Sequence, residues 1–357
     1  MTIREEHYFA CANTSIGFQN LYESNLKGLN KFYNLYGVSS KYISKLLTAI
    51  AKYYKEDNNS IEYIHCPANP DMLEGIIIRN KKVAILDGNR PYINQINNKS
   101  IKKINIGIPT LSKEKLPNNI DQINSTINQL YSKAYIAFNN AIKVHDEWEK
   151  IYIANMDFKK ANELTEKYIN DLFATCKKHE SGIIRHRFFG GSTPNGSVDY
   201  VTNLTKDIKN RYFIKGRPGS GKSTMLKQMV NKADSLNLDA EVYHCSFDPK
   251  SLDMLLVPEL DLCIFDSTYP HEYFPDKEDD NVIDMYTELI TPGTDEKYKN
   301  ELSNIKLRYK TLISAGILYL KEISKLDEEL YKFNLRNIDK KKCTLIIDNL
   351  VKQISSM

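Results

Sequence analysis

Residues 216–224 form a glycine-rich turn between a short apolar segment and a helix-like stretch, and read Gly-Arg-Pro-Gly-Ser-Gly-Lys-Ser-Thr. The apolar segment 212–214 precedes the turn. Apolar residues at helical spacing follow it, at Met225, Leu226, Met229 and Val230. A strand, such a turn and a helix in this order gather backbone N–H groups at the positive end of a helix dipole, which attracts phosphate. The pattern Gly-x4-Gly-Lys-Ser/Thr therefore predicts a P-loop.

The motif assigns chemistry to individual residues of this run. Lys222 would contact the β- and γ-phosphates of ATP or GTP, and the Ser223 hydroxyl would ligate Mg²⁺. The alternative is a chance glycine-rich turn, which the flanking strand and helix patterns argue against. The predicted nucleotide-binding residues are Gly216, Arg217, Pro218, Gly219, Ser220, Gly221, Lys222, Ser223 and Thr224.

The chain also repeats itself once, at an offset of 179 residues. Residues 7–92 match residues 186–271 without a gap, with about 17 identical pairs, many of them at turn residues and strand ends. A period of this length indicates tandem domains, and 357 residues suit two domains of ordinary size. We expect domains at 1–178 and 179–357. Each would be an α/β P-loop NTPase-like domain, with a parallel sheet flanked by helices and a helical C-terminal extension.

The two copies differ at the P-loop itself. Where the second half has Gly-Lys-Ser at 221–223, the first has Tyr-Ile-Ser at 42–44. Tyr42 places a large side chain where only glycine leaves room for a phosphate, and Ile43 removes the cation. The first half is therefore predicted to be a degenerate P-loop-like domain. An unrelated fold for residues 1–178 is the alternative, and the ungapped match argues against it.

An aspartate after an apolar strand forms a second motif. Residues 262–266 read Leu-Cys-Ile-Phe-Asp, which is typical of a strand buried on both faces. Asp266 would lie at the carboxyl end of that strand, where ligands bind in open α/β sheets. There it would hold Mg²⁺ directly or through water. The predicted metal ligands are Ser223 and Asp266.

Asp248 follows an earlier strand-like segment, 240–245, and its counterpart in the first half is Asn69. It is a candidate general base aimed at an acceptor hydroxyl. The alternative is an aspartate that caps the next element. No glutamate follows Asp266 directly, which argues against a fast motor-type ATPase. The predicted catalytic residues are Lys222, Asp248 and Asp266.

The pairs His65-Cys66 and His244-Cys245 each lie in a strand-like run. Adjacent strand residues point to opposite faces, so we expect strand-end packing and no zinc site. Further along each half, apolar stripes at helical spacing predict packing faces that join the halves or form a long antiparallel helical pair. The stripes are Ile313, Ile317, Leu320, Ile323 and Leu326, and Ala134, Ile136, Phe138, Ile142 and Trp148.

Composition excludes several classes of protein. The net charge of +4 is small for 357 residues, and no basic block with interleaved aromatics occurs, so the sequence argues against a nucleic-acid partner. No segment approaches 18 apolar residues, and the N-terminus has no signal-peptide pattern. Six scattered cysteines predict free thiols. We expect a cytoplasmic protein with no membrane contact.

The whole pattern resembles a family of uncharacterised bacterial tandem P-loop proteins of spore-forming Gram-positive lineages, labelled ATPase-like or nucleotide-kinase-like. The resemblance covers the second half and, more faintly, the first, and it implies nucleotide binding and hydrolysis without a known substrate. Tyr42 and Ile43 depart from members with a fuller first site. The runs that carry the resemblance are 186–190, 193–196, 211–219, 220–227, 243–245, 247–249, 265–268, 270–275 and 292–298.

These features predict an enzyme that uses ATP or GTP with Mg²⁺ in its C-terminal half, either as an ATPase or as a kinase of a small acceptor. The alternative is a nucleotide-gated switch or adaptor whose degenerate half binds a protein partner. A nucleic-acid-processing ATPase is the weakest of the three readings. Arg308 and Arg336 could reach a phosphate if the helical region closes as a lid.

Overall fold

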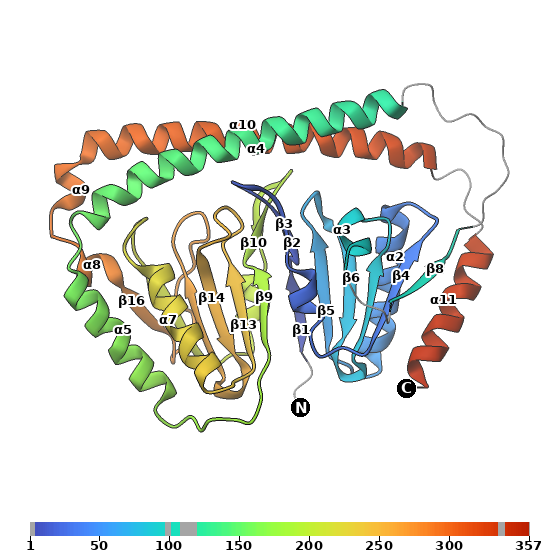
Figure 1. Cartoon of the computed structure of the whole chain (residues 1–357), viewed down its shortest axis with the longest axis horizontal. Helices are drawn as coiled ribbons and strands as arrows, with labels where there is room; N and C mark the ends of the chain where they lie inside the picture. The colour runs from blue at the N-terminus through green and yellow to red at the C-terminus, as the bar shows by residue number, and fades with distance from the viewer. Residues whose placement is uncertain (1–3, 97–100, 108–119, 335–339, 357) are drawn as a thin grey trace.

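Two six-stranded sheets stand side by side in the computed structural model, which describes residues 4–96, 101–107, 120–334 and 340–356 (Figure 1). In spatial order the first sheet contains β1 (Glu5–Tyr8), β5 (Ile61–Cys66), β6 (Asn69–Ile78), β7 (Val83–Asp87), β4 (Lys31–Tyr36) and β8 (Ile101–Asn105). The second contains β9 (Ile184–Phe188), β13 (Ala240–His244), β14 (Leu252–Val257), β15 (Leu262–Asp266), β12 (Asn210–Lys215) and β16 (Asn281–Asp284).

The two sheets have the same strand order, and their strands match at the offset found in the sequence. Lys31–Tyr36 and Asn210–Lys215 lie 179 residues apart, as do Val83–Asp87 and Leu262–Asp266. Two short hairpins repeat in the same way, β2 (Cys11–Thr14) with β3 (Gly17–Asn20) and β10 (Gly190–Thr193) with β11 (Gly196–Asp199). The two halves of the chain therefore share one sheet topology.

The sheets are mixed, whereas the sequence predicted parallel ones. β14 is antiparallel to both β13 and β15, and β6 is antiparallel to both β5 and β7. The connection from β14 to β15 is the three-residue helix η2 (Pro258–Leu260) followed by Asp261, whose φ is +48°. A parallel neighbour needs a crossover of a dozen or more residues, so this connection closes a hairpin.

Helices cover both sheets. α2 (Ser40–Glu56) and α7 (Lys222–Ser235) follow β4 and β12, and four short helices are α1 (Tyr22–Asn25), α3 (Pro91–Asn94), α6 (Val201–Thr205) and α8 (Met285–Leu289). The remaining helices are α4 (Ile120–Ile153), α5 (Phe158–Phe173), α9 (Thr294–Lys297), α10 (Lys299–Asn334) and α11 (Lys340–Ser355). Among the described helices, none is long and apolar enough to cross a membrane.

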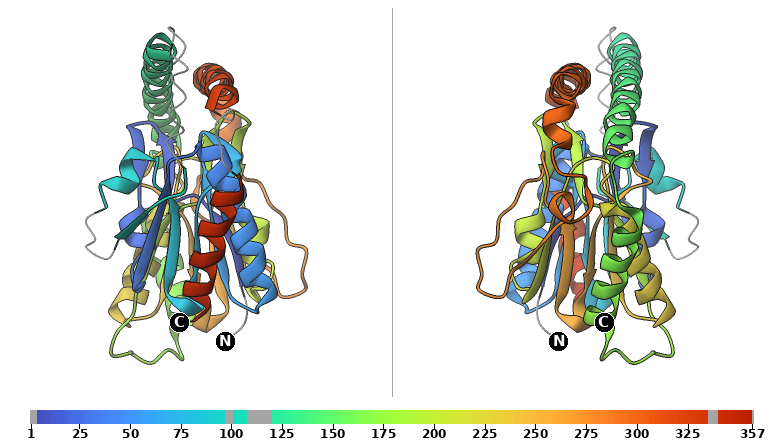
Figure 2. Two further views of the ribbon diagram at one scale, coloured as in Figure 1. Left: turned by 90° about the vertical axis from the view of Figure 1, so that its right-hand side faces the viewer. Right: turned by 90° about the vertical axis from the view of Figure 1, so that its left-hand side faces the viewer.

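The last helix of each half packs on the sheet of the other half. Leu164 and Phe173 of α5 join the core formed by α7 and the second sheet. Conversely, Ile347 and Leu350 of α11 join the core of α2 and the first sheet. Figure 2 shows α11 beside the first sheet and α5 beside the second. The helical extensions are thus exchanged between the halves, and neither core is complete without residues from both.

The exchange is carried by α4 and α10, which run antiparallel across the same end of both sheets (Figure 1). The stripe from Ile313 to Leu326 packs against Ala134 and Phe138 in one apolar cluster, so the predicted antiparallel pair is confirmed. Ile136 was wrongly assigned to this face, because its side chain is 62% exposed. Phe138 is fully buried against Gly316, whose missing side chain lets the two helices approach.

A buried arginine ties the two sheets together. Arg187 in β9 is fully buried and donates to Glu6, Glu62 and Glu241, at 2.9, 2.8 and 3.0 Å. Its guanidinium also lies 4.0 Å from the ring centroid of Tyr8. Burial alone would raise the pKa of Glu62, but Arg79 and Arg187 lower it to about 2. Arg187 therefore joins acids of both halves at their interface, where Arg4 also lies 3.0 Å from Glu6 and 3.8 Å from Glu241.

Each half also contains one hydrogen-bonded histidine pair built from repeated residues. The Pro70 carbonyl accepts from His65 Nδ1 at 2.7 Å, so His65 Nε2 is free to accept from His7 Nδ1 at 2.8 Å. His186 and His244 repeat the contact at 2.8 Å. His65 and His244 lie near the ends of β5 and β13, as predicted. Neither pair lies within a group of metal-ligating side chains in the described ranges.

We expect the first histidine pair to make stability depend on pH. Burial lowers the pKa of His65 to about 4, from an ordinary value near 6.5. The unfolded chain then binds more protons between these values, so stability is full above pH 6.5 and falls toward pH 4, on the order of 2–3 kcal/mol for His65. Urea unfolding of the wild type and of His65→Gln at both pH values tests this. Parallel pH profiles for the two proteins would contradict it.

Candidate functional site

The predicted P-loop connects β12 to α7 at the carboxyl end of the second sheet. Gly219 and Gly221 have φ angles of +77° and +89°, a region that favours glycine. A side chain on Gly216 would collide with the Ser220 hydroxyl, which is buried inside the loop and accepts from the Arg217 N–H at 3.3 Å. The three glycines are therefore required by the shape of the turn.

The turn leaves the first N–H groups of α7 facing outward. Gly221 is the N-cap residue and provides no side-chain cap, and the first backbone bond of the helix runs from Met225 N–H to the Gly221 carbonyl at 3.0 Å. The N–H groups of residues 222–224 precede that bond and so lack intrahelical partners. An anion is the natural partner for such groups at the positive end of the helix dipole.

Lys222 lies along the inside of the loop. Its Nζ donates to the Arg217 carbonyl at 2.9 Å and lies 3.6 Å from Asp266 Oδ2, while its side chain is only 10% exposed. Asp266 ends β15, which pairs in parallel with β12 and places Asp266 opposite Ile214. Lys222 and Asp266, two of the three predicted catalytic residues, are thus close together because β12, which leads into the loop, and β15 are neighbouring strands.

Asp266 also has partners that the sequence did not indicate. Its Oδ1 accepts from the N–H and hydroxyl of Thr268, at 3.1 and 2.6 Å, which directs Oδ2 toward Lys222. Asp253 in β14 lies behind it. Burial and the nearby Asp266 raise the pKa of Asp253 to about 7. The counterpart of Asp253 in the first half is Glu74, so an acid recurs at this position.

The predicted metal ligands suit Mg²⁺ by donor type. Asp266 Oδ2 and Ser223 Oγ are hard oxygen donors, the type that Mg²⁺ prefers. Ser223 Oγ accepts from Leu252 N–H at 2.9 Å, which leaves its second lone pair for a cation. Ser44 makes the same bond with Leu73 N–H at 2.9 Å, so this hydrogen bond holds the helix to the sheet in both halves.

Arg217 points away from the cradle. Its guanidinium pairs with Asp295 of α9 at 2.9 Å and lies 4.6 Å from the ring centroid of Tyr286. Tyr152 of α4 donates to the same aspartate at 2.6 Å. Of the predicted nucleotide-binding residues, Arg217 therefore contributes its backbone to the loop and its side chain to the surrounding helices.

Asp248 makes the contacts of a capping residue. Its carboxylate accepts from the Ser251 hydroxyl at 2.8 Å and from Lys250 N–H at 3.2 Å, within the turn between β13 and β14. These bonds correspond to the structural alternative considered for this residue. Its charge contributes to the pKa values of His145 and Glu149, so the carboxylate lies in their neighbourhood.

Helix α4 of the first half brings residues to the site that the motifs missed. A side chain on Gly219 would lie 2.7 Å from the Glu149 carbonyl and 3.1 Å from its Cβ. His145, Asp146 and Glu149 present ligand atoms within 4.8 Å of one another. A usable sequence signal existed, because the 179-residue offset carries Glu149 onto Glu328 in α10.

In the first half the corresponding loop is closed into a helix. α2 begins at Ser40, which corresponds to Gly219, and Ser39 caps it by accepting from Tyr42 N–H at 3.3 Å. Ile43, at the position of Lys222, is fully buried in the core. The N–H groups that face outward in the second half are partly satisfied here by the chain itself. The capped start of α2 and the buried Ile43 account for the predicted lack of a nucleotide site in the first half more fully than the bulk of Tyr42 does.

The cation has also moved in the first half. Asp87, the counterpart of Asp266, is fully buried, and Arg90 Nε lies 3.2 Å from it and 3.3 Å from Glu74. Arg90 lies three residues after the end of β7, where the second half has Tyr269. Asp87 and Glu74, the counterparts of Asp266 and Asp253, therefore have Arg90 as their counter-charge within the first half.

Arg308 does not face the P-loop. It forms a two-pronged ion pair with Glu147 of α4, at 2.8 and 2.9 Å, on the exposed side of the helical pair. Arg336 lies outside the described residues. The pair between Arg308 and Glu147 therefore joins α10 to α4.

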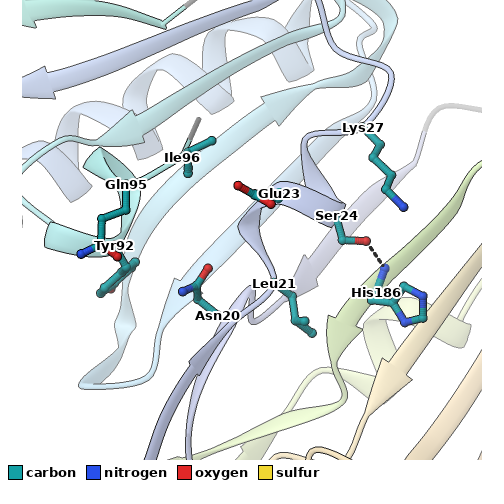
Figure 3. Close-up of a pocket in the computed structure, with 9 residues that line it drawn as sticks. All are labelled: Asn20, Leu21, Glu23, Ser24, Lys27, Tyr92, Gln95, Ile96 and His186. Atoms are coloured by element: carbon teal, nitrogen blue, oxygen red, sulfur yellow. Dashed lines mark hydrogen bonds between the residues drawn. The ribbon is translucent and has the colours of Figure 1, made fainter. Parts of the chain in front are cut away.

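A separate hollow of about 720 Å³ lies between the halves (Figure 3). Glu23 and Lys27 line it from the first half, with Tyr92 near its far side, and His186 lines it from the second. The His186 N–H donates to the Ser24 hydroxyl at 2.7 Å, which closes one side of it. None of the predicted phosphate-binding residues lines this hollow.

Comparison of the chain with protein-family models, curated proteins and solved structures gave no significant match.

Proposed function

We propose that the C-terminal half binds a nucleoside triphosphate with Mg²⁺ and hydrolyses or transfers its terminal phosphoryl group, and that the N-terminal half lacks a nucleotide site. The observation that carries this proposal is the position of Lys222. Its ammonium group is held between the Arg217 carbonyl and Asp266, beside the uncapped start of α7. Phosphoryl transfer requires charge neutralisation and positioning, and these groups supply both.

When bound, Mg²⁺ would neutralise phosphate charge. Ser223 and Asp266 would hold the ion, and Lys222 would exchange its bond to the Arg217 carbonyl for phosphate oxygens. The residues assigned here would bind phosphate and Mg²⁺, which ATP and GTP have in common. Both nucleotides therefore fit the loop. The phosphoryl acceptor would be water or a small hydroxyl compound.

We expect Lys222→Ala to abolish stabilisation by Mg–ATP. A ligand at 100 times its Kd stabilises the folded state by about 2.7 kcal/mol, which thermal unfolding detects readily. Ile43→Val is the matched control, because it alters the corresponding residue of the degenerate loop. It removes one buried methyl group, costing about 0.5–1.5 kcal/mol of basal stability, and should keep the full ATP increment. Equal loss of the increment in both variants would contradict the proposal.

One contact favours the nucleotide-gated switch as a second function. The tip of the P-loop, Gly219, touches Glu149 of α4, and α4 belongs to the half without a predicted nucleotide site. A phosphate entering the loop would act directly on that helix. Incubation with γ-labelled ATP separates the two functions. A kinase or ATPase yields labelled acceptor or phosphate at a steady rate, whereas a switch retains bound nucleotide until a partner is added.

A further inference from the structure

The two predicted catalytic acids of the P-loop half are both engaged. Ser267 follows Asp266, and Asp248 is engaged in its own turn through Ser251 and Lys250. Asp266 is directed at Lys222 by Thr268 and is the predicted metal ligand. The acids left to activate water are Asp253 of β14, which lies near Asp266, and a carboxylate that another element brings to the loop.

Helix α4 supplies one. A Cβ added to Gly219 would lie 2.7 Å from the Glu149 carbonyl oxygen, so the helix passes close to the loop. The Glu149 carboxylate is acted on by the Gly219 N–H and by Lys222, which favour its ionised form, and by Asp146 and Asp248, which oppose it. His145 Nδ1 lies 3.8 Å from the Glu149 carboxylate. A carboxylate at this point faces the groups that would hold a terminal phosphate.

The repeat indicates that this position has a specific role. Glu328 in α10 is the counterpart of Glu149, and it pairs at 2.7 Å with Lys41 in the first turn of α2. Each long helix therefore brings a glutamate to the connection between strand and helix of the opposite half. In the degenerate half a lysine at the start of α2 pairs with that glutamate. In the intact half the corresponding loop residue is Ser220, so Glu149 has no lysine there to bind it.

We propose that Glu149, delivered by the N-terminal half, is the general base for hydrolysis in the C-terminal half. This inference depends on the proposed nucleotide site. Glu149 accepts a proton from a water molecule while the water oxygen forms a bond to the γ-phosphorus. The bond from the γ-phosphorus to the β–γ bridging oxygen breaks, and its electron pair leaves with the nucleoside diphosphate. The proton then passes from Glu149 to solvent, which restores the base.

The degenerate half thereby acquires a function without a nucleotide of its own. Helix α4 of the N-terminal half completes the site of the C-terminal half. The first sheet holds α4 in place indirectly, through the helices that the two halves exchange. The hydrolytic site is composite, so the C-terminal half expressed alone would lack its base. The two halves of one chain thus contribute to one site, as two subunits do at the interface of a symmetric dimer.

The test compares Glu149→Gln with Glu328→Gln, the matched change on the opposite helix. Binding of a non-hydrolysable Mg–ATP analogue and steady-state phosphate release are measured on full-length proteins. General-base catalysis contributes about 10²–10⁴-fold, so we expect Glu149→Gln to lower kcat at least about 100-fold, with the analogue Kd changed less than about threefold. Glu328→Gln should change neither quantity.

A pH profile provides the second readout. Burial and Asp146 raise the pKa of Glu149, with Lys222 and the Gly219 N–H opposing and Asp248 reinforcing the rise. Burial and Lys222 lower the pKa of His145 to about 4, so His145 is neutral near pH 7. The base is lost by protonation as pH falls, so wild-type kcat should decline on the acid side. The residual activity of Glu149→Gln should lack that limb.

The outcomes separate this inference from the proposed function. A wild-type protein that binds no nucleotide would reject the nucleotide site, and the inference with it. Wild-type binding and hydrolysis with an unchanged kcat in Glu149→Gln would reject the inference alone. Tighter analogue binding with unchanged kcat would show that Glu149 obstructs the loop, and it would also overturn the role as base.

Discussion

Replacing Arg187 with leucine is expected to lower the free energy of unfolding by about 3–5 kcal/mol. Removing one partner of a buried ion pair leaves the remaining charges uncompensated in a low-dielectric interior. Here three glutamates, Glu6, Glu62 and Glu241, share the same guanidinium. Arg4 also pairs with Glu6 and Arg79 with Glu62, but Arg187 is the fully buried partner of all three. Burial and Glu241 already raise the pKa of Glu6, so this acid is the first expected to take up a proton in the variant.

Urea unfolding at pH 7 measures the effect, and Arg308→Leu is the control. Arg308 also forms a two-pronged bond to a glutamate, but on an exposed helix surface. Exposed pairs of this kind contribute little, so the control should unfold essentially as the wild type does. Similar destabilisation by the two variants would show that burial of Arg187 is not what matters. Lower ionic strength should not restore the Arg187 variant.

The second large effect is expected at the crossing of the two long helices. Phe138→Ala should cost about 3–5 kcal/mol, because it leaves a cavity where a fully buried ring packed. The ring lies against the Gly316 backbone, and a Cβ at Gly316 would come within 2.7 Å of Phe138 Cδ1. This contact holds α4 on α10, and α4 carries Glu149 to the P-loop. Nucleotide hydrolysis should therefore fall with the stability of the pair.

A double-mutant cycle sharpens this expectation. Gly316→Ala should destabilise the wild type, because its methyl group collides with the Phe138 ring. In the Phe138→Ala background the same change should stabilise by about 0.5–1 kcal/mol, since alanine is the better helix former and the space is open. The sign of the effect therefore reverses between backgrounds. Additive effects would exclude direct packing of residue 138 on residue 316.

Local patterns predicted the P-loop region well. The segment 210–235 reads as strand, glycine turn and helix, and the structure has these elements there, with Lys222 beside Asp266. No local pattern marked the strand β14 at 252–257. The three-residue connection that follows it indicates a hairpin, because a parallel neighbour needs a longer crossover. The strand β16 likewise lies outside the motifs of the sequence.

The order and spacing of residues along the chain were enough to establish the duplication, the sequence of strand, loop and helix around Lys222, and the loss of the cation at Ile43. The three-dimensional packing alone revealed the exchange of α5 and α11 and the arrival of Glu149 at Gly219. An amphipathic helix shows in its residues that one face must be buried, but the surface that buries it depends on the shape of the whole molecule. The patterns of α5 and α11 are equally compatible with each helix packing on the sheet of its own half.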